Sequence, residues 1–457
     1  MNDGSSTAAA TETRSYVIEG KTDLEVERIA FGVSNMAANK AYRYAAEQAG
    51  GDPDGAVLRR FQDRFRWYRE SWRGLPAQSV AEKRWGDSFA ALDYPPLCVD
   101  VESAAVCDLA CPFCFRQWIA TPDKIIDFDL FRRIVDQCAE LGVPSMKLNW
   151  RGEPLLHPQL PEMVDLAKRA GILEVLINTN ATTLDAAKSR ALIDAGLDMM
   201  IYSFDGGSKD TYERMRPGRF KRNTFDAVYE NIRRFAEIRA ETGSVFPRTR
   251  IQMVLTEETY QERDDFFALF EDCVDDVSVK AYTERGGKIS ELDAETRARL
   301  SDEIEQLDLP DDTPVRRDLG GTLYVSTGRL PCEQPFQRML VTYDGRVSMC
   351  CYDWGSQYPV GYVDGLAIES GEREYEKIME KVADGAKGFE LMAGAAMPER
   401  MNEPEPVVRT LQQIWHGGDI NHVRRKHVCG EGETVSACRR CTFKETYAWK
   451  AVASDEL

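Results

Sequence analysis

Three cysteines stand close together soon after an apolar run, and this short stretch constrains the chain more than any other. Cys107, Cys111 and Cys114 follow the run Leu97–Val101 and occupy positions i, i+4 and i+7 of one segment. Thiolates at this spacing can hold three corners of a cubic iron–sulfur cluster, whereas a fully ligated cluster takes four. An iron without a protein ligand is an open coordination site, as in catalytic metal sites. We therefore expect the rest of the chain to bring another molecule to this iron.

Length and charge narrow the class of protein. A chain of 457 residues is longer than one that folds around a single ordinary hydrophobic core, so two or three domains are expected. The net charge of −18 disfavours nucleic acid as a partner, because phosphate binding needs clustered Lys and Arg. No run approaches the roughly 18 apolar residues of a membrane span, and residues 1–14 do not resemble a signal peptide. A cytoplasmic location is expected, where the 12 cysteines stay reduced and can bind metal.

From Leu97 onward, strand-like and helix-like segments alternate. The strand candidates are short apolar runs, namely Leu97–Val101, Met146–Trp150, Val175–Asn178, Met199–Phe204, Thr249–Leu255 and Val277–Tyr282. The helix candidates between them are Phe128–Leu141, Gln159–Ala170, Leu184–Ala195, Thr224–Thr242 and Glu262–Asp272. Strand–helix units that repeat in this way imply a parallel sheet, either open or curled into a barrel. We expect an α/β fold built on a partial (β/α)6 barrel of the TIM type.

These patterns divide the chain into three parts. Residues 1–94 are expected to form a disordered tail and a helical N-terminal extension, without a strand-rich module for docking peptides. The barrel is assigned to residues 95–287. Residues 288–457 hold a linker and a second, cysteine-rich domain, within which residues 369–406 look inserted. A hairpin is expected there, with strands Phe336–Val341 and Arg346–Met349 around an Asp-Gly turn.

Polar residues follow successive strand candidates, at the carboxyl ends where barrels of this type place their chemistry. The second candidate is followed by Arg151-Gly-Glu153, and Glu153 can neutralise an ammonium group. The third ends at Asn178-Thr-Asn180 and the fourth at Ser203-Phe-Asp205. Small polar side chains at these positions suit hydroxyl and carboxylate groups, and Arg216 could supply a cation for a carboxylate.

The spacing C-x3-C-x2-C of Cys107–Cys114 resembles that of the radical S-adenosylmethionine (radical SAM) enzymes, with Phe113 at the aromatic position of their motif. The resemblance implies that Gly152 and Glu153 bind the methionine amino group, as part of the family's Gly-Gly-Glu-Pro motif. Arg151 stands where that motif has its first glycine. The ribose and the methionine carboxylate would be held by Asn178, Asn180, Ser203 and Asp205. The alternatives for the three cysteines are a zinc site or unrelated core thiols.

A second set of residues lies in the C-terminal part. It comprises Cys332, Gly345, Cys350, Trp415, Cys438 and Cys441, and it resembles the SPASM (or shorter twitch) extension that carries auxiliary iron–sulfur clusters. Four cysteines can complete one closed 4Fe–4S cluster, and no further cysteine follows Cys441, so one auxiliary cluster is expected. Cys351 and Cys429 are unassigned, and either could be a ligand or a free thiol. A zinc ribbon that uses Cys350 and Cys351 with the last pair is the alternative.

The resemblance also implies the chemistry. S-adenosylmethionine chelates the open iron, an electron from a donor such as flavodoxin or ferredoxin breaks a carbon–sulfur bond, and the 5′-deoxyadenosyl radical abstracts a hydrogen atom. The protein contributes positioning and the exclusion of water. After the sixth strand candidate, Tyr282, Glu284 and Arg285 could bind and deprotonate a hydroxylated substrate. The alternative for Glu284 and Arg285 is a solvated ion pair.

We interpret the chain as a radical SAM oxidoreductase, by type a dehydrogenase, that acts on a small hydroxylated molecule. A sugar, nucleotide sugar or aminocyclitol is the first choice of substrate, and the auxiliary 4Fe–4S cluster is the expected electron acceptor. The first alternative is an enzyme that matures a peptide or protein. The second is a non-catalytic iron–sulfur scaffold protein, which the departure at Arg151 favours.

Overall fold

A computed structural model describes residues 22–84, 92–114, 116, 122–281, 315–317, 323–353, 355–356, 358–369, 407–439, 441, 443 and 446–452. Its centre is a sheet with the strand order β11-β10-β9-β1-β2-β3-β4-β5-β6. The six strands that follow one another along the chain are β1 (Cys98–Val101), β2 (Ser145–Lys147), β3 (Glu174–Thr179), β4 (Met199–Ser203), β5 (Arg248–Leu255) and β6 (Asp276–Ala281). They pair in parallel with their neighbours, which confirms the predicted parallel α/β fold.

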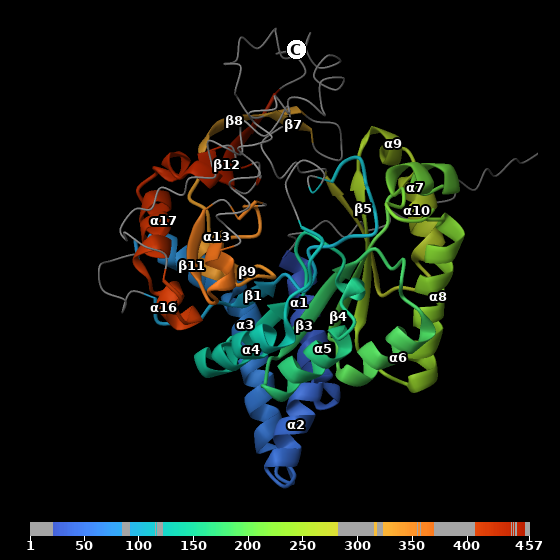
Figure 1. The fold of residues 1–457 in the computed structure, drawn as a ribbon, viewed down its shortest axis with the longest axis horizontal. Coiled ribbons are helices and arrows are strands. Elements are labelled where there is room, and N and C mark those ends of the chain that lie inside the picture. Colours follow the sequence, from blue (N-terminus) through green and yellow to red (C-terminus); the bar gives the residue numbers. More distant parts are fainter. Residues whose placement is uncertain are drawn as a thin grey trace, which may run out of the picture.

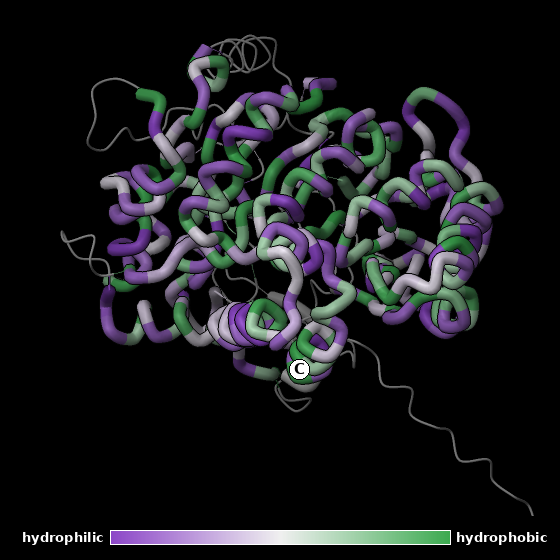
Figure 2. Tube along the Cα trace, turned by 90° about the horizontal axis from the view of Figure 1, so that it is seen from below, coloured by the Kyte–Doolittle hydropathy of each residue, from purple (hydrophilic) through white to green (hydrophobic). Residues whose placement is uncertain are grey.

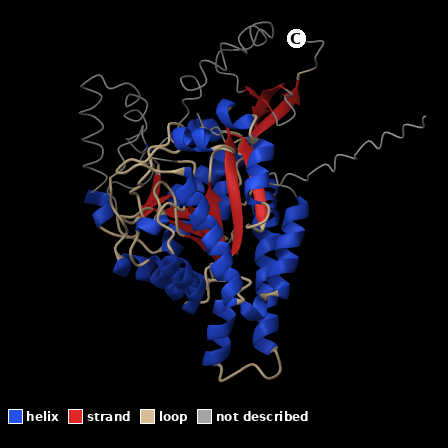
Figure 3. Ribbon diagram, turned by 90° about the vertical axis from the view of Figure 1, so that its right-hand side faces the viewer, coloured by secondary structure: helices blue, strands red, loops and turns tan. Residues whose placement is uncertain are grey.

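Helices connect these strands and pack on the sheet (Figures 1 and 3). They are α4 (Phe128–Leu141), α5 (Leu160–Arg169), α6 (Ala186–Ala195), α7 (Lys209–Met215), α8 (Phe225–Thr242), α9 (Glu257–Tyr260) and α10 (Arg263–Phe270). α4 shows why the sequence predicts them well. The Asp127 carboxylate accepts hydrogen bonds from the backbone N–H groups of Asp129 and Leu130, and the helix ends at Gly142, whose φ of 77° favours glycine.

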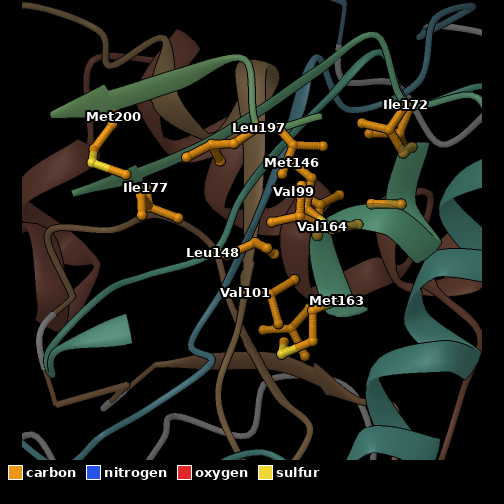
Figure 4. Packing of buried hydrophobic residues seen from close by; sticks show 14 of the residues in the cluster. Val99, Val101, Met146, Leu148, Met163, Val164, Ile172, Ile177, Leu197 and Met200 are labelled. Carbon is orange, nitrogen blue, oxygen red and sulfur yellow. The ribbon is translucent and has the colours of Figure 1, made fainter. Parts of the chain in front are cut away.

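The core lies between the strands and these helices. Val99 and Val101 of β1 and Met146 of β2 are fully buried, as are Met163 and Val164 of α5. Figure 4 shows these side chains gathered in one cluster. Figure 2 shows hydrophobic and hydrophilic residues interspersed along the chain, and no helix in the described part is long and apolar enough to cross a membrane.

The N-terminal extension is helical in its described part: α1 (Thr22–Ser34), α2 (Lys40–Gln48) and α3 (Ala56–Ala81), with the short 3-10 helix η1 (Met36–Ala38) between the first two. These helices are anchored to the amino end of β3. Glu174 accepts hydrogen bonds from Arg28 at 2.6 Å and from Tyr68 at 2.9 Å, and Arg69 lies 3.5 Å away. Burial alone would raise the pKa of Glu174, but Arg28 and Arg69 outweigh it and hold the value at about 2.

The C-terminal part continues the main sheet. β9 (Arg338–Val341) pairs in parallel with β1, and β10 (Arg346–Ser348) and β11 (Pro359–Tyr362) follow as antiparallel strands. The predicted hairpin is present, but its first strand begins at Arg338, because Gln334–Gln337 form the helical turn α13. Pro335 explains this difference, since its fixed φ suits the first turn of a helix.

Further elements complete the C-terminal part. A separate small sheet contains β7 (Val315–Arg317), β8 (Leu323–Arg329) and β12 (Tyr447–Ala451). The helices are α16 (Leu411–Trp415), α17 (Gly418–Val428), the 3-10 helix η5 (Gly432–Thr434) and α18 (Ser436–Arg439). Figure 1 shows α16 and α17 beside β11 and α13, at the end of the sheet away from α8 and α10. The domain boundaries at residues 94 and 287 stay predictions, and residues 370–406 lie outside the described part.

Candidate functional site

The cysteine loop follows β1 and is tied to the loop after α7. Leu109 forms a β-bridge with Gly218, the Ala110 N–H donates to the Pro217 carbonyl at 2.9 Å, and the Arg219 N–H donates to the Asp108 carbonyl at 2.7 Å. The three thiols lie close enough to influence one another electrostatically. Burial raises the pKa of Cys107 to about 12, so cluster assembly there must displace protons from the thiols.

The segment after β2 lies directly against the start of the cysteine loop. The Glu153 N–H donates to the Val106 carbonyl at 2.8 Å. A Cβ atom on Gly152 would stand 2.2 Å from the Ala104 carbonyl oxygen, so only glycine fits this approach. The Glu153 side chain is 2% exposed, and burial raises its pKa to about 7. Its carboxylate accepts hydrogen bonds from the backbone N–H groups of Leu155 at 3.0 Å and Asn180 at 2.7 Å, so it holds two strand ends together.

Arg151 occupies the position of the family's first glycine, and its side chain turns into the protein. Its guanidinium makes two hydrogen bonds to the fully buried Glu102, at 2.7 and 2.9 Å, and lies over the Trp150 ring. Glu102 also accepts the Tyr343 N–H at 3.3 Å, and the Trp150 indole donates to the Cys351 carbonyl at 3.0 Å. These contacts join the loop after β2 to the cysteine-rich region.

The strand ends beyond β2 contribute polar groups to the same edge. The Asn180 amide donates to Asp108 of the cysteine loop at 2.8 Å. The Asn178 N–H donates to Asn149 at 2.8 Å, but the Asn178 Oδ1 is buried without a hydrogen-bond partner among the described residues. A buried acceptor of this kind costs about 1–3 kcal/mol, which a donor on a ligand would offset. Ser203 is the last residue of β4 and is half-buried.

Asp205 and Arg216 form a buried ion pair beside the cysteine loop. The Arg216 Nε donates to Asp205 at 2.7 Å, and the other Asp205 oxygen accepts the Val254 N–H at 2.6 Å. Arg216 lies 5.9 Å from the Phe113 ring centre, and its charge opposes the effect of burial, which raises the pKa of Cys111. The predicted cofactor-binding side chains are thus brought together. Tyr282, Glu284 and Arg285 lie outside the described residues.

A pocket in the C-terminal part gathers four cysteines from separate segments of the chain. We call it the second pocket, because the cysteine loop is the first site. The thiols of the second pocket are Cys332, Cys350, Cys438 and Cys441. The other side chains around the pocket include apolar ones, such as Pro335, Met349 and Phe443, and polar ones, such as Gln334 and Thr446. Arg329 donates to the carbonyl of Cys438 and, at 3.2 Å, to that of Cys441. The two unassigned residues, Cys351 and Cys429, are not among those that line this pocket, and Cys429 is exposed.

His427 of α17 lines the same pocket, and it is not among the residues predicted from the sequence. Its Nδ1 accepts the Cys332 N–H at 3.3 Å, and its Nε2 lies 3.4 Å from the Cys438 sulfur. Burial, with Arg329 as a second cause, lowers the pKa of His427 to about 4. No local signal could have found this residue, because its position depends on how α17 packs against the segment around Cys332.

The donor sets suit the groups that the cysteines predict. Four thiols around one pocket fit a closed iron–sulfur cluster, and three thiols on one loop fit a cluster with an open iron. Among the residues described, no group of three or more His, Cys, Asp or Glu side chains already has the arrangement of metal ligands. The structure therefore brings the thiols of each set near one another, and binding of the metal would complete their ligand geometry.

Comparison with protein families gives two matches. Residues 101–270 match the radical SAM superfamily, and residues 332–378 match an iron–sulfur cluster-binding domain, SPASM. Both matches confirm what the cysteine spacing predicts. The first covers β1 to α10, and the second begins at the first cysteine of the second pocket.

Three curated relatives share part of the chain. A tungsten-containing aldehyde ferredoxin oxidoreductase cofactor-modifying protein from Pyrococcus furiosus is 27% identical over 35% of this chain and 44% of its own. A GTP 3′,8-cyclase from Chlorobaculum tepidum is 30% identical over 34% and 44%. The PqqA peptide cyclase from Gluconobacter oxydans is 33% identical over 27% and 34%. The chain thus spans less than half the length of these relatives.

Proposed function

We propose that this chain, which carries a radical SAM domain followed by a SPASM domain, is an oxidoreductase that acts on a small hydroxylated molecule. The substrate class is a sugar, a nucleotide sugar or an aminocyclitol. The observation that carries the proposal is the presence of two thiol sets, one on the loop after β1 and one in the second pocket, joined through Trp150 and Cys351. Two separate centres allow hydrogen abstraction at one and electron acceptance at the other.

The first centre would be held by Cys107, Cys111 and Cys114 on their loop. When bound there, a reduced 4Fe–4S cluster supplies the electron that cleaves S-adenosylmethionine to the 5′-deoxyadenosyl radical. The chain's own residues orient the cofactor. Asn178 offers to a hydroxyl or amino group its Oδ1, which has no hydrogen-bond partner within the described part of the chain, and the Asp205–Arg216 pair places opposite charges beside the loop.

The second centre would be a single auxiliary 4Fe–4S cluster on the four pocket cysteines. Two of these cysteines, Cys350 and Cys438, are buried, which limits the access of water to the metal. We assign to the cluster the role of accepting the electron that the substrate radical gives up as it becomes the oxidised product. Tyr282, Glu284 and Arg285 are proposed to bind the substrate and remove a proton from its hydroxyl group.

Two relatives point in different directions for the substrate. The name of one contains a nucleotide, GTP, which agrees with a small hydroxylated substrate, whereas the name of another contains a peptide, PqqA. Maturation of a peptide is therefore the second candidate function. All regular elements described ahead of β1 are helices, and this supports the small molecule because a strand-rich peptide-docking module would require strands.

Iron analysis and cofactor cleavage test the proposal. Full-length protein reconstituted without oxygen is expected to hold about eight irons per chain, which corresponds to two cubane clusters. With a strong reductant it should convert S-adenosylmethionine to 5′-deoxyadenosine, and replacement of Cys107, Cys111 and Cys114 by Ala should abolish this. An intact, fully loaded protein that never cleaves the cofactor would instead support the non-catalytic scaffold.

The substrate class needs a separate measurement. Panels of sugars, nucleotide sugars and aminocyclitols are compared with short peptides for their ability to stimulate 5′-deoxyadenosine formation. A deuterated substrate should pass its label to 5′-deoxyadenosine. Label transfer from a peptide, and from none of the small molecules, would replace the first candidate by the second.

A further inference from the structure

We infer that the His427 imidazole donates a hydrogen bond from its Nε2 to the Cys438 thiolate and thereby raises the reduction potential of the auxiliary cluster. The inference rests on the proposed auxiliary cluster and assigns to it a residue that is not a metal ligand. His427 acts through Cys438, so it is a positioning residue that tunes the cluster.

The tautomer follows from the backbone contact of the ring. The Cys332 N–H points at Nδ1 from 3.3 Å, so Nδ1 must be the acceptor and carries no proton. The single proton of the neutral imidazole is then on Nε2, which lies 3.4 Å from the Cys438 sulfur. A protonated Nε2 cannot bind iron. The same contact thus makes His427 a hydrogen-bond donor and excludes it as a ligand through that nitrogen.

The ring is fixed in this orientation from several sides. It is 2% exposed, and a Cβ atom on Gly432 would stand 2.6 Å from its Nδ1, so glycine leaves just enough space for the ring. One turn earlier on α17, the buried Arg424 donates to the Pro335 carbonyl at 3.0 Å and to the Trp415 carbonyl at 2.7 Å. These bonds hold α17 against the segment that contains Cys332.

The effect on the cluster has a simple electrostatic cause. A hydrogen bond to a ligand sulfur withdraws electron density and stabilises the more negative, reduced state. In this pocket, where the Cys350 and Cys438 thiols are buried, one such donor has more influence than it would have in water. A raised potential suits a cluster that accepts an electron from the substrate.

The test uses full-length protein in which Cys107, Cys111 and Cys114 are Ala, so that only the auxiliary cluster contributes to the spectra. The midpoint potential is measured by a redox titration followed by electron paramagnetic resonance, together with iron content. H427L should keep about four irons per chain and shift the potential downward, and H427Q, which retains an N–H donor, should restore part of the shift. H422L, on the same helix, is the matched control and should leave the potential unchanged.

An unchanged midpoint potential in H427L would overturn the inference, and so would loss of iron in both H427L and H427Q.

A measurement without substitution covers the case in which H427L does not fold. In protein labelled with ¹⁵N-histidine, pulsed spectroscopy of the reduced cluster should show a weak nitrogen coupling and an exchangeable proton. A strong coupling typical of a ligand, or no coupling, would contradict it. If the protein with Ala at Cys107, Cys111 and Cys114 and an intact His427 held no iron, the proposed auxiliary cluster itself would be refuted. This outcome is distinct from failure of the inference about His427.

Discussion

The two cysteine sites are built in opposite ways. The first takes its thiols from one loop, Cys107–Cys114, and is surrounded by charges that are already paired, such as Arg151 with Glu102 and Arg216 with Asp205. The second takes its thiols from three separate segments, and its lining combines apolar side chains such as Met349 and Phe443 with polar ones such as Arg329. The first site can therefore form wherever its loop is held, whereas the second exists only when distant parts of the chain have folded together. Loss of metal should affect them differently.

The largest expected effect comes from removing the auxiliary ligands. Cys438→Ser with Cys441→Ser should lose about four irons per chain and loosen residues 407–439, because metal binding that joins separate segments contributes directly to folding. Hydrogen exchange should show faster exchange in α16 and α17, with β1 to β5 unchanged. The variant with serine in place of Cys107, Cys111 and Cys114 should lose as much iron without this change in hydrogen exchange. Equal loosening in both variants would remove the difference between the two sites.

Breaking the connection between the sites should cost less. Arg151→Met leaves Glu102 buried without its cation, a change that costs about 3–5 kcal/mol. Since Glu102 also accepts the Tyr343 N–H, both sites should lose iron. Urea unfolding and iron analysis measure the effect. The double variant Arg151→Met with Glu102→Leu should recover much of the stability, and failure to recover would mean that the ion pair is not the cause.

A change at the amino end of β3 should alter stability without touching either site. The folded-state pKa of Glu174, about 2, lies below its ordinary value of 4.5, so its charge contributes stability above about pH 4.5 that is lost as the pH falls towards 2. Glu174→Gln should destabilise the chain by about 3 kcal/mol at pH 7. In urea unfolding at a series of pH values, the gap in unfolding free energy to the wild type should narrow below about pH 4.5 and close as the pH approaches 2. A difference in stability that does not change with pH would contradict the view that the charge of Glu174 stabilises the fold.

The smallest expected effect is confined to the first site. Gly152→Ala places a methyl group against the Ala104 carbonyl, and overpacking of this kind costs about 1–3 kcal/mol. Cleavage of S-adenosylmethionine should fall while the auxiliary iron is retained. Gly74→Ala is the matched control, because nothing lies within 4 Å of its added Cβ and it should stabilise α3 by about 0.5–1 kcal/mol. Loss of auxiliary iron in Gly152→Ala would show that the effect of the added methyl group is not confined to the first site.

Sequence reasoning succeeded where the determinants are local. Asp127 and Gly142 mark the ends of α4, and the spacing of Cys107–Cys114 marks the first site, because each depends on residues close together in the chain. The predicted parallel sheet and both family matches follow from such short patterns. The order of polar residues after successive strands likewise places Glu153 and Asn180 within hydrogen-bond distance.

The remainder depends on contacts between distant residues, which carry no local pattern. In the sequence, Arg151 is only a departure from the family motif. The structure shows that it pairs with the buried Glu102, which no local pattern indicates. Arg329 and His427 reach the second pocket from a strand and a helix that only tertiary packing brings there. The pairing of β9 with β1 was also not predicted, since the C-terminal part was assigned to a domain of its own.

That pairing has a consequence for how the protein is made. β1 lies between β2 and β9, so one of its neighbours leaves the ribosome long after the other. During synthesis the nascent chain exposes the unpaired edge of β1, and such edges invite association with other chains. The loop after β1 is attached to this unfinished edge. Insertion of metal is therefore best timed after translation of residues 338–341, and a nascent chain that ends before them would need a chaperone to cover β1.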